Sequence, residues 1–232
     1  MTPGPRNDTL TRFTSFSGKR PESIDLVIHL PSESAVRGEA SVGDFAGEGA
    51  LGAVRLKSDL GDIRPAQTAD ATLRSALGEI VLGNATGTAE IHNGSGGIRA
   101  GVIDGTADVS NSNGSVSLGT VTGRVQVKTL NGPLSVDCAL GDITATSANG
   151  EIGIGQVVCG KATASSKHGR VEVGVRAGSA AWLDLNTTVG RVYNELDAAS
   201  EPDESEPVAT VEVRASTKVG DIVIRRSPRA EA

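Results

Sequence analysis

The chain has 232 residues, a length that favours one domain or at most two. Hydrophobic residues make up 38%, charged residues 22% and the net charge is -6, which argues against a disordered polymer and against a basic nucleic-acid-binding protein. Aromatic residues account for only 2% while glycine occurs 30 times, so aliphatic side chains rather than rings must fill the core.

Residues 1–20 are polar and lack the apolar stretch of a secretion signal. No apolar run in the sequence is long enough to cross a bilayer. We therefore expect residues 1–22 to be disordered and the protein to be cytoplasmic, without a membrane span and without a nucleic-acid partner. Cys138 and Cys159 are too few for a disulfide framework, and we expect them to be free thiols.

A repeat begins soon after the N-terminal segment. Residues 23–30 alternate as a strand that Pro31 ends, and residues 36–45 open the regular part. Glycines then recur at a nearly constant spacing, at Gly43, Gly61, Gly78, Gly96, Gly114, Gly132, Gly150, Gly169, Gly190 and, after a longer gap, Gly220. A second series lies about half a period away, at Gly87, Gly105, Gly123, Gly141 and Gly160.

Apolar side chains follow each glycine at alternate positions, as in Ile80 and Leu82 or Ala89 and Ile91. This period of two is typical of half-buried strands, and no helical stripe persists. Equivalent short strands that return once in each repeat are best satisfied when they stack in parallel. The sequence therefore predicts an all-β fold for residues 23–226: a single-stranded parallel β-solenoid of about ten coils.

The corners of the coils carry a further pattern. The glycines there permit a positive φ and let successive backbones approach closely. Asn113, Asn131 and Asn149 each precede such a glycine. Because they stack one coil apart, we expect them to form an amide ladder that stabilises the rod.

The pattern weakens at the C-terminal end, where residues 180–197 form a coil with larger side chains. We expect Trp182 and Tyr193 to pack as a cap over this end. Residues 197–207 are acidic and contain proline, so they predict a loop insertion. The chain then re-enters the repeat, and residues 227–232 form a polar tail.

Candidate catalytic residues lie on the outward positions of the strands. On the second stack these positions run, in chain order, from Arg55 to Asp184 and from Lys57 to Asn186. Glu90 beside Asp108 is a carboxylate pair that could act as general acid and base, but Arg74 or Lys128 can neutralise it. His29, His92 and His168 lack metal-ligand spacing. We therefore expect no catalytic, cofactor-binding or metal-binding residues and no cofactor.

Asp44, Asp62 and Glu79 form an acidic ladder, with like charges stacked one coil apart. Such charges repel, and a divalent cation bound between them could relieve the repulsion. We favour solvated carboxylates flanked by Arg64 and Lys57. The G-G-x-G-x-D repeat of calcium-binding solenoids is absent, since the only Gly-Gly pair is followed by a different pattern.

Four segments carry a resemblance to a known family: VRGEASVGDF, GTADVSNSNG, AAWLDLNTTVGRVYNELD and VEVRASTKVGDIVIRR. They resemble the bacterial β-strand-repeat, adhesin-like family of unknown function, which is related to the toastrack domains of envelope-stress proteins. The likeness spans about residues 23–226. It implies a single all-β solenoid without established catalytic residues.

Three functions follow as hypotheses. The first is a non-enzymatic scaffold that binds an unidentified protein partner or another copy of itself through the ends of the solenoid. The second, implied by the resemblance, is a membrane-associated envelope-stress sensor or adhesin-like domain. The third is a carbohydrate-active enzyme that uses Glu90 and Asp108.

Overall fold

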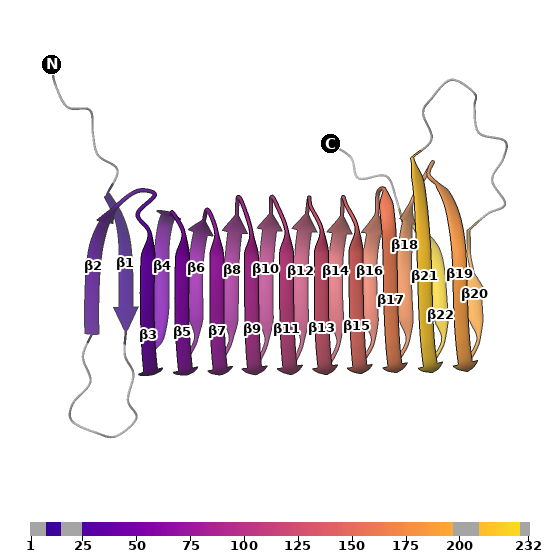
Figure 1. Ribbon diagram of the computed structural model, residues 1–232, viewed down its shortest axis with the longest axis horizontal. Coiled ribbons are helices and arrows are strands. Elements are labelled where there is room, and N and C mark those ends of the chain that lie inside the picture. The colour runs from indigo at the N-terminus through magenta and orange to yellow at the C-terminus, as the bar shows by residue number, and fades with distance from the viewer. Residues whose placement is uncertain (1–7, 15–24, 197–208, 228–232) are drawn as a thin grey trace, which may run out of the picture.

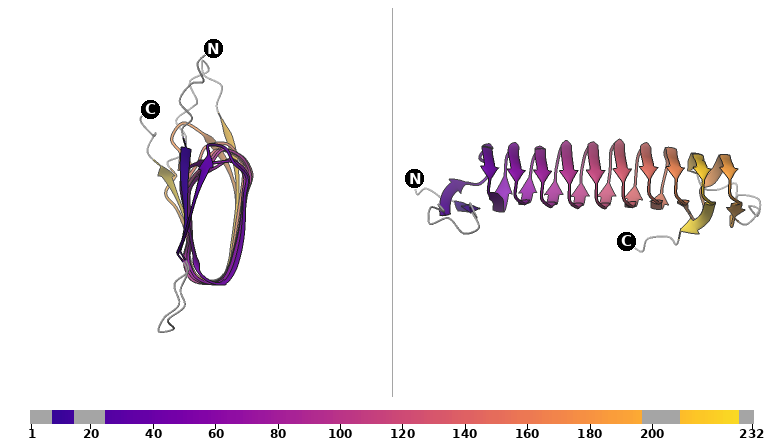
Figure 2. Two further views of the ribbon diagram at one scale, coloured as in Figure 1. Left: turned by 90° about the vertical axis from the view of Figure 1, so that its left-hand side faces the viewer. Right: turned by 90° about the horizontal axis from the view of Figure 1, so that it is seen from below.

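The computed structural model describes residues 8–14, 25–196 and 209–227. This part of the chain forms 22 β-strands and contains no helix. The strands wind into a long rod in which two sheets face each other, seen from the side in Figure 1 and end-on as a flattened oval in Figure 2. No helix that could span a membrane occurs in the described residues.

One sheet holds twelve strands, and its members are named here in spatial order. They are β2 (Asp25–Pro31), β1 (Asp8–Thr14), β4 (Asp44–Leu51), β6 (Ile63–Thr68), β8 (Ile80–Ala85), β10 (Ile98–Ile103), β12 (Val116–Val121), β14 (Leu134–Ala139), β16 (Ile152–Val157), β18 (Val171–Arg176), β22 (Ile222–Ser227) and β20 (Val192–Asn194). We call it the first sheet.

The opposite sheet holds ten strands and is called the second sheet. From the same end of the rod its members are β3 (Val36–Val42), β5 (Val54–Leu60), β7 (Ala71–Leu77), β9 (Ala89–Ser95), β11 (Ala107–Asn113), β13 (Val125–Asn131), β15 (Ile143–Asn149), β17 (Gly160–His168), β21 (Thr210–Val219) and β19 (Ala180–Val189).

The register confirms the predicted parallel solenoid. Ile80 pairs with Ile98, Ile98 with Val116, and Val116 with Leu134, so each residue lies beside its equivalent in the next repeat. About eight coils follow each other regularly in chain order, from β3–β4 to β17–β18, and this regular series is slightly shorter than the expected ten. The coils β21–β22 and β19–β20 complete the rod.

Aliphatic side chains from both sheets fill the interior, as the composition predicts. The predicted inward positions, such as Ile80, Leu82, Ala89 and Ile91, are all buried. Phe45 of β4 is the one aromatic ring in the described core, and it lies at the first coil. Burial of such side chains is the main contribution to the stability of the rod.

The corner glycines meet the expectation in one series and only partly in the other. From Gly61 to Gly220 the first series has positive φ, with Gly43 as the exception. In the second series only Gly160 has a positive φ. Gly105 of that series is needed for space, because a Cβ there would lie 2.3 Å from the carbonyl oxygen of Gly87. The second corner therefore requires glycine for close approach rather than for conformation.

A ladder of inward polar side chains lies at the corner that follows the second sheet, and the repeat pattern did not predict it. Ser58 donates a hydrogen bond to the Gly43 carbonyl (2.9 Å), and Asn93 does the same to the Gly78 carbonyl (3.0 Å). This inward polar ladder comprises Ser58, Ser75, Asn93, Asn111, Thr129, Ser147, Ser166, Thr217 and Thr187. Most of its members bond corner carbonyls, which satisfies backbone acceptors in the turn.

The N-terminal end corrects one expectation. Residues 8–14, expected to be disordered, form β1, which pairs antiparallel with both β2 and β4. The apolar residues of this strand, Leu10 and Phe13, are three positions apart, so the segment lacks the period of two that marks the later strands. The other residues of 1–22, most of the tail 227–232 and the acidic insertion 197–207 lie outside the described residues.

The C-terminal end reverses the order of its coils. β21 lies between β17 and β19, and β22 lies between β18 and β20. The last coil in the sequence is therefore inserted into the rod, and the preceding coil, β19–β20, forms its terminus (Figure 1). The rows of outward residues are corrected accordingly, since Arg214 separates Thr163 from Asp184.

Candidate interaction surfaces

The carboxylate pair lies where the sequence placed it, on the outward face of the second sheet. Glu90 of β9 and Asp108 of β11 are neighbours in register. Arg74 donates a hydrogen bond of 2.8 Å to Glu90, and His92 Nε2 lies 3.0 Å from the same oxygen. The Arg74 hydrogen bond, together with that of His92, lowers the pKa of Glu90. Glu90 is therefore a carboxylate at neutral pH and a poor general acid.

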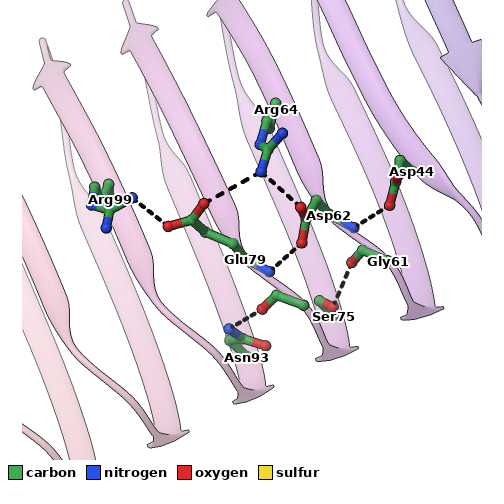
Figure 3. A network of polar contacts seen from close by, with 9 residues as sticks. Asp44, Gly61, Asp62, Arg64, Ser75, Glu79, Asn93 and Arg99 are labelled. Carbon is green, nitrogen blue, oxygen red and sulfur yellow. Dashed lines mark hydrogen bonds and ion pairs between the residues drawn. The ribbon is translucent and has the colours of Figure 1, made fainter.

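The acidic ladder lies at the corner where strands β4, β6 and β8 of the first sheet begin, and hydrogen bonds link each of its members to the next coil (Figure 3). Asp44 accepts the backbone N–H of Asp62 at 2.8 Å, and Asp62 accepts that of Glu79 at 2.7 Å. Arg64 bridges Asp62 and Glu79, and Arg99 pairs with Glu79. These oxygens are engaged by cations and by backbone N–H groups of the next coil.

Lys57, expected beside this ladder, is on the other sheet and pairs with Glu39. Aspartates at other corners use the same bond to the next coil, as Asp70 does with Thr88 N–H (2.8 Å) and Asp142 with Lys161 N–H (2.9 Å). The described acidic corner residues thus act mainly as caps for backbone donors.

The remaining candidate residues are not brought together. His29 lies in β2, His92 in β9 and His168 at the end of β17. Among the residues that the structure describes, no group of three or more histidine, cysteine or acidic side chains could hold a metal ion. Cys138 and Cys159 are free, as expected. Cys138 pairs in register with Gln156, while Cys159 donates to the Leu140 carbonyl.

The terminal coil β19–β20 leaves the interior of the rod open. Leu183 and Leu185 occupy inward positions of β19 but are only half-buried, and Val192 of β20 is 43% exposed. Val213 and Ile222, the register partners of Leu183 and Val192 one coil inside, are fully buried. The core therefore continues to the end of the described rod without a lid from the described residues.

Trp182 and Tyr193 do not pack over this opening, in contrast to the expected cap. They occupy outward positions and are 54% and 42% exposed. The Arg214 guanidinium lies 5.8 Å from the centre of the Trp182 ring, a cation-π distance. The two aromatic side chains of this coil thus face outward and do not cover the core.

The two strands of the terminal coil carry little of the charge or proline that usually protects edge strands, although β20 is itself short, with three residues. Natural edges carry lysine, proline, bulges or inward charges that prevent further pairing. In β19 only Asp184 is charged, and β20 carries no charged residue. Within the described chain, β19 pairs only with β21 and β20 only with β22. Each therefore presents one side of its backbone to an incoming strand.

The opposite end of the rod has a different shape. β1 and β2 extend the first sheet by two strands beyond β4, while the second sheet stops at β3 (Figures 1 and 2). With a strand spacing of about 4.8 Å, this makes a step of about 10 Å. The edge β2 also contains Pro31, and β3 carries Arg37 and Glu39. This end is thus stepped and partly protected.

One long corner of the rod exposes apolar side chains at its N-terminal part. Val42, Leu60 and Leu77 stack in register and are each about half exposed. Further along the same corner the row becomes the asparagine ladder: Asn131 donates to Asn113 at 2.9 Å and Asn149 donates to Asn131 at 3.0 Å. The predicted amide ladder is confirmed.

The fold defines the protein as a parallel β-solenoid with an N-terminal antiparallel hairpin. Comparison with family models, with curated proteins and with solved structures gives no match.

Proposed function

We propose that the protein is a non-enzymatic interaction module that associates with a second copy of itself through the coil β19–β20. The observation that supports this most directly is the coincidence, at one end, of the long edge of β19, which carries a single charge, the short uncharged edge of β20 and an open apolar interior. Exposed apolar surface flanked by free edges favours association.

A second copy suits this end better than an isolated strand or helix does. The two edges belong to opposite sheets, which lie about 10 Å apart in packed β structures. A partner must therefore supply two strand edges at this separation, with apolar side chains such as Leu183 and Val192 between them. The same end of another copy meets this requirement by symmetry.

The geometry favours a closed dimer over a filament. A two-fold axis perpendicular to the sheets would place β19 antiparallel to its copy and β20 antiparallel to its copy, so both sheets continue across the interface. Joining this level end to the stepped end formed by β1, β2 and β3 would leave a gap of two strands in the second sheet. A head-to-tail chain of rods is therefore disfavoured.

The test is the mass of the protein in solution, measured by sedimentation over a range of concentrations. The wild type is expected to sediment as a dimer of the 23.5 kDa chain. Val192→Lys and Leu183→Lys place a charge in the apolar interface and are expected to give monomers. Circular dichroism shows whether each variant keeps its strands.

Leu77→Lys is the matched control, because Leu77 is a similarly exposed apolar residue far from the terminal coil. It is expected to remain dimeric. A wild type that stays monomeric at all concentrations, or a control that dissociates like Val192→Lys, contradicts the proposal. Long filaments in electron micrographs would contradict the closed dimer.

A further inference from the structure

A hollow of about 300 Å³ opens on the outward face of the second sheet near its N-terminal end. Strands β3, β5, β7 and β9 form it. The charged and hydroxyl side chains that line it are Arg37, Glu39, Arg55, Lys57, Thr72, Arg74 and Glu90. Four of these side chains are cationic and two are anionic.

Two of the four cations are neutralised within the hollow. Lys57 pairs with Glu39, and Arg74 pairs with Glu90 at 2.8 Å. The hydrogen bond to Lys57 lowers the pKa of Glu39, as that to Arg74 does for Glu90. Both carboxylates are therefore charged at neutral pH and matched by these partners.

The other two cations, Arg37 and Arg55, form no ion pair with a described residue. They lie directly opposite each other on neighbouring strands. The lowered pKa of Glu39 is due mainly to the hydrogen bond and the charge of Lys57, and the charge of Arg37 contributes least. Like charges in this position destabilise a sheet. The pair is a local excess of positive charge in a chain whose net charge is -6.

A further carboxylate, Asp70, lines an adjoining hollow that Arg37 and Arg55 also line. Its Oδ1 atom accepts the backbone N–H of Thr88 at 2.8 Å. Asp70 thus acts as a corner cap like the other corner aspartates, and one of its oxygens is already engaged.

We propose that Arg37 and Arg55 bind a tetrahedral oxyanion, a phosphate or sulfate group, with the Thr72 hydroxyl beside it. A dianion neutralises the two guanidinium groups that lack an ion pair within the protein. Guanidinium groups match the oxygens of such anions through paired N–H donors. Thr72 continues the row of Arg37 and Arg55 on the next strand, so its hydroxyl lies beside the bound group.

Binding is tested by titrating the protein with sodium phosphate, sodium sulfate and sodium acetate at constant ionic strength. Backbone amide chemical shifts and the midpoint of thermal unfolding are followed. Phosphate or sulfate is expected to shift the amides around Arg37, Arg55 and Thr72 and to raise the thermal midpoint. The two anions in separate arms distinguish a phosphate site from a sulfate site, and acetate is expected to bind more weakly than either.

Variants separate the site from general charge. Arg37→Gln and Arg55→Gln are each expected to reduce anion affinity at least about tenfold, because each removes a set of charge-assisted hydrogen bonds. Arg55→Gln also removes the like-charge contact, so without anion it should unfold at a slightly higher temperature than the wild type. Arg99→Gln is the control, because Arg99 is on the other sheet and is paired with Glu79.

The proposal is overturned if neither phosphate nor sulfate changes the thermal midpoint at constant ionic strength. It is also overturned if Arg99→Gln weakens binding as much as Arg55→Gln does, or if acetate binds as tightly as the tetrahedral anions.

Discussion

At the scale of single residues, the corner glycines set how closely successive coils approach. Gly132 has φ +124°, and a Cβ at this position would lie 2.3 Å from the carbonyl oxygen of Gly114 in the preceding coil. Both the backbone conformation and the space therefore exclude a larger residue. Gly153, within β16, has no such constraint, since the nearest atom to its added Cβ is 3.9 Å away.

This contrast gives a stability prediction. Gly132→Ala is expected to lower the free energy of unfolding by about 2–4 kcal/mol, because the methyl group forces two coils apart and strains φ. Gly153→Ala is expected to change it by less than about 1 kcal/mol. Denaturant unfolding of the two variants measures both values, and equal destabilisation by the two would refute this role for the corner.

Some polar roles could be predicted from the sequence and others could not. Asn113, Asn131 and Asn149 recur at one position of the repeat, so their ladder is visible as a pattern. The inward polar ladder that includes Ser58 and Asn93 changes residue type from coil to coil. Most of its members share a hydrogen bond to a corner carbonyl, which is a feature of three-dimensional geometry that no single residue type marks.

The pair Arg37 and Arg55 belongs to the same group of missed features. The predicted rows of outward residues begin only at Arg55, because β3 does not show the apolar alternation of the later strands. Gly38 occupies an inward position there, and a Cβ on it would meet the Phe45 ring at 2.8 Å. The large ring of Phe45 thus replaces an aliphatic side chain and hides the repeat in β3.

At the scale of strands, the regular coils were predictable because a constant repeat length and a period of two determine both register and orientation. The inverted order of the last two coils was not. β19 and β21 are equally long and have the same alternation, so either could follow β17. The charge pattern is the signal that distinguishes them: β21 carries Glu212, which pairs with Lys161 of β17 at 3.2 Å.

Cross-linking tests this order of strands. With Cys138 and Cys159 replaced by serine, Ser165→Cys combined with Ser216→Cys is expected to form a disulfide on oxidation. The two serine hydroxyl oxygens are 3.1 Å apart in the structure. Ser165→Cys combined with Asn186→Cys is the control and should remain reduced, because β21 separates these strands. Cross-linking of the control pair instead would show that the coils follow chain order.

At the scale of the whole molecule, charge along the sides of the rod is largely balanced by pairs between neighbouring side chains. Arg214 with Glu212 and Arg225 with Glu172 are examples, each at 2.8 Å. Such exposed pairs contribute little to stability individually. Most described charges on the sides of the rod are thus paired within the protein. The terminal coil β19–β20, in contrast, has free backbone edges and an open core.

The arrangement of two rods in a dimer can be measured between the copies themselves. In a chain without native cysteines, a spin label is attached at Thr188→Cys of β19, and electron-electron distances between copies are determined. Pairing through the terminal coil predicts a short, narrow distance distribution for this label, whereas a label at Asp25→Cys of β2, at the opposite end, gives only long distances or none. A short distance from the Asp25 position, or no distance from the Thr188 position, would contradict pairing through the terminal coil.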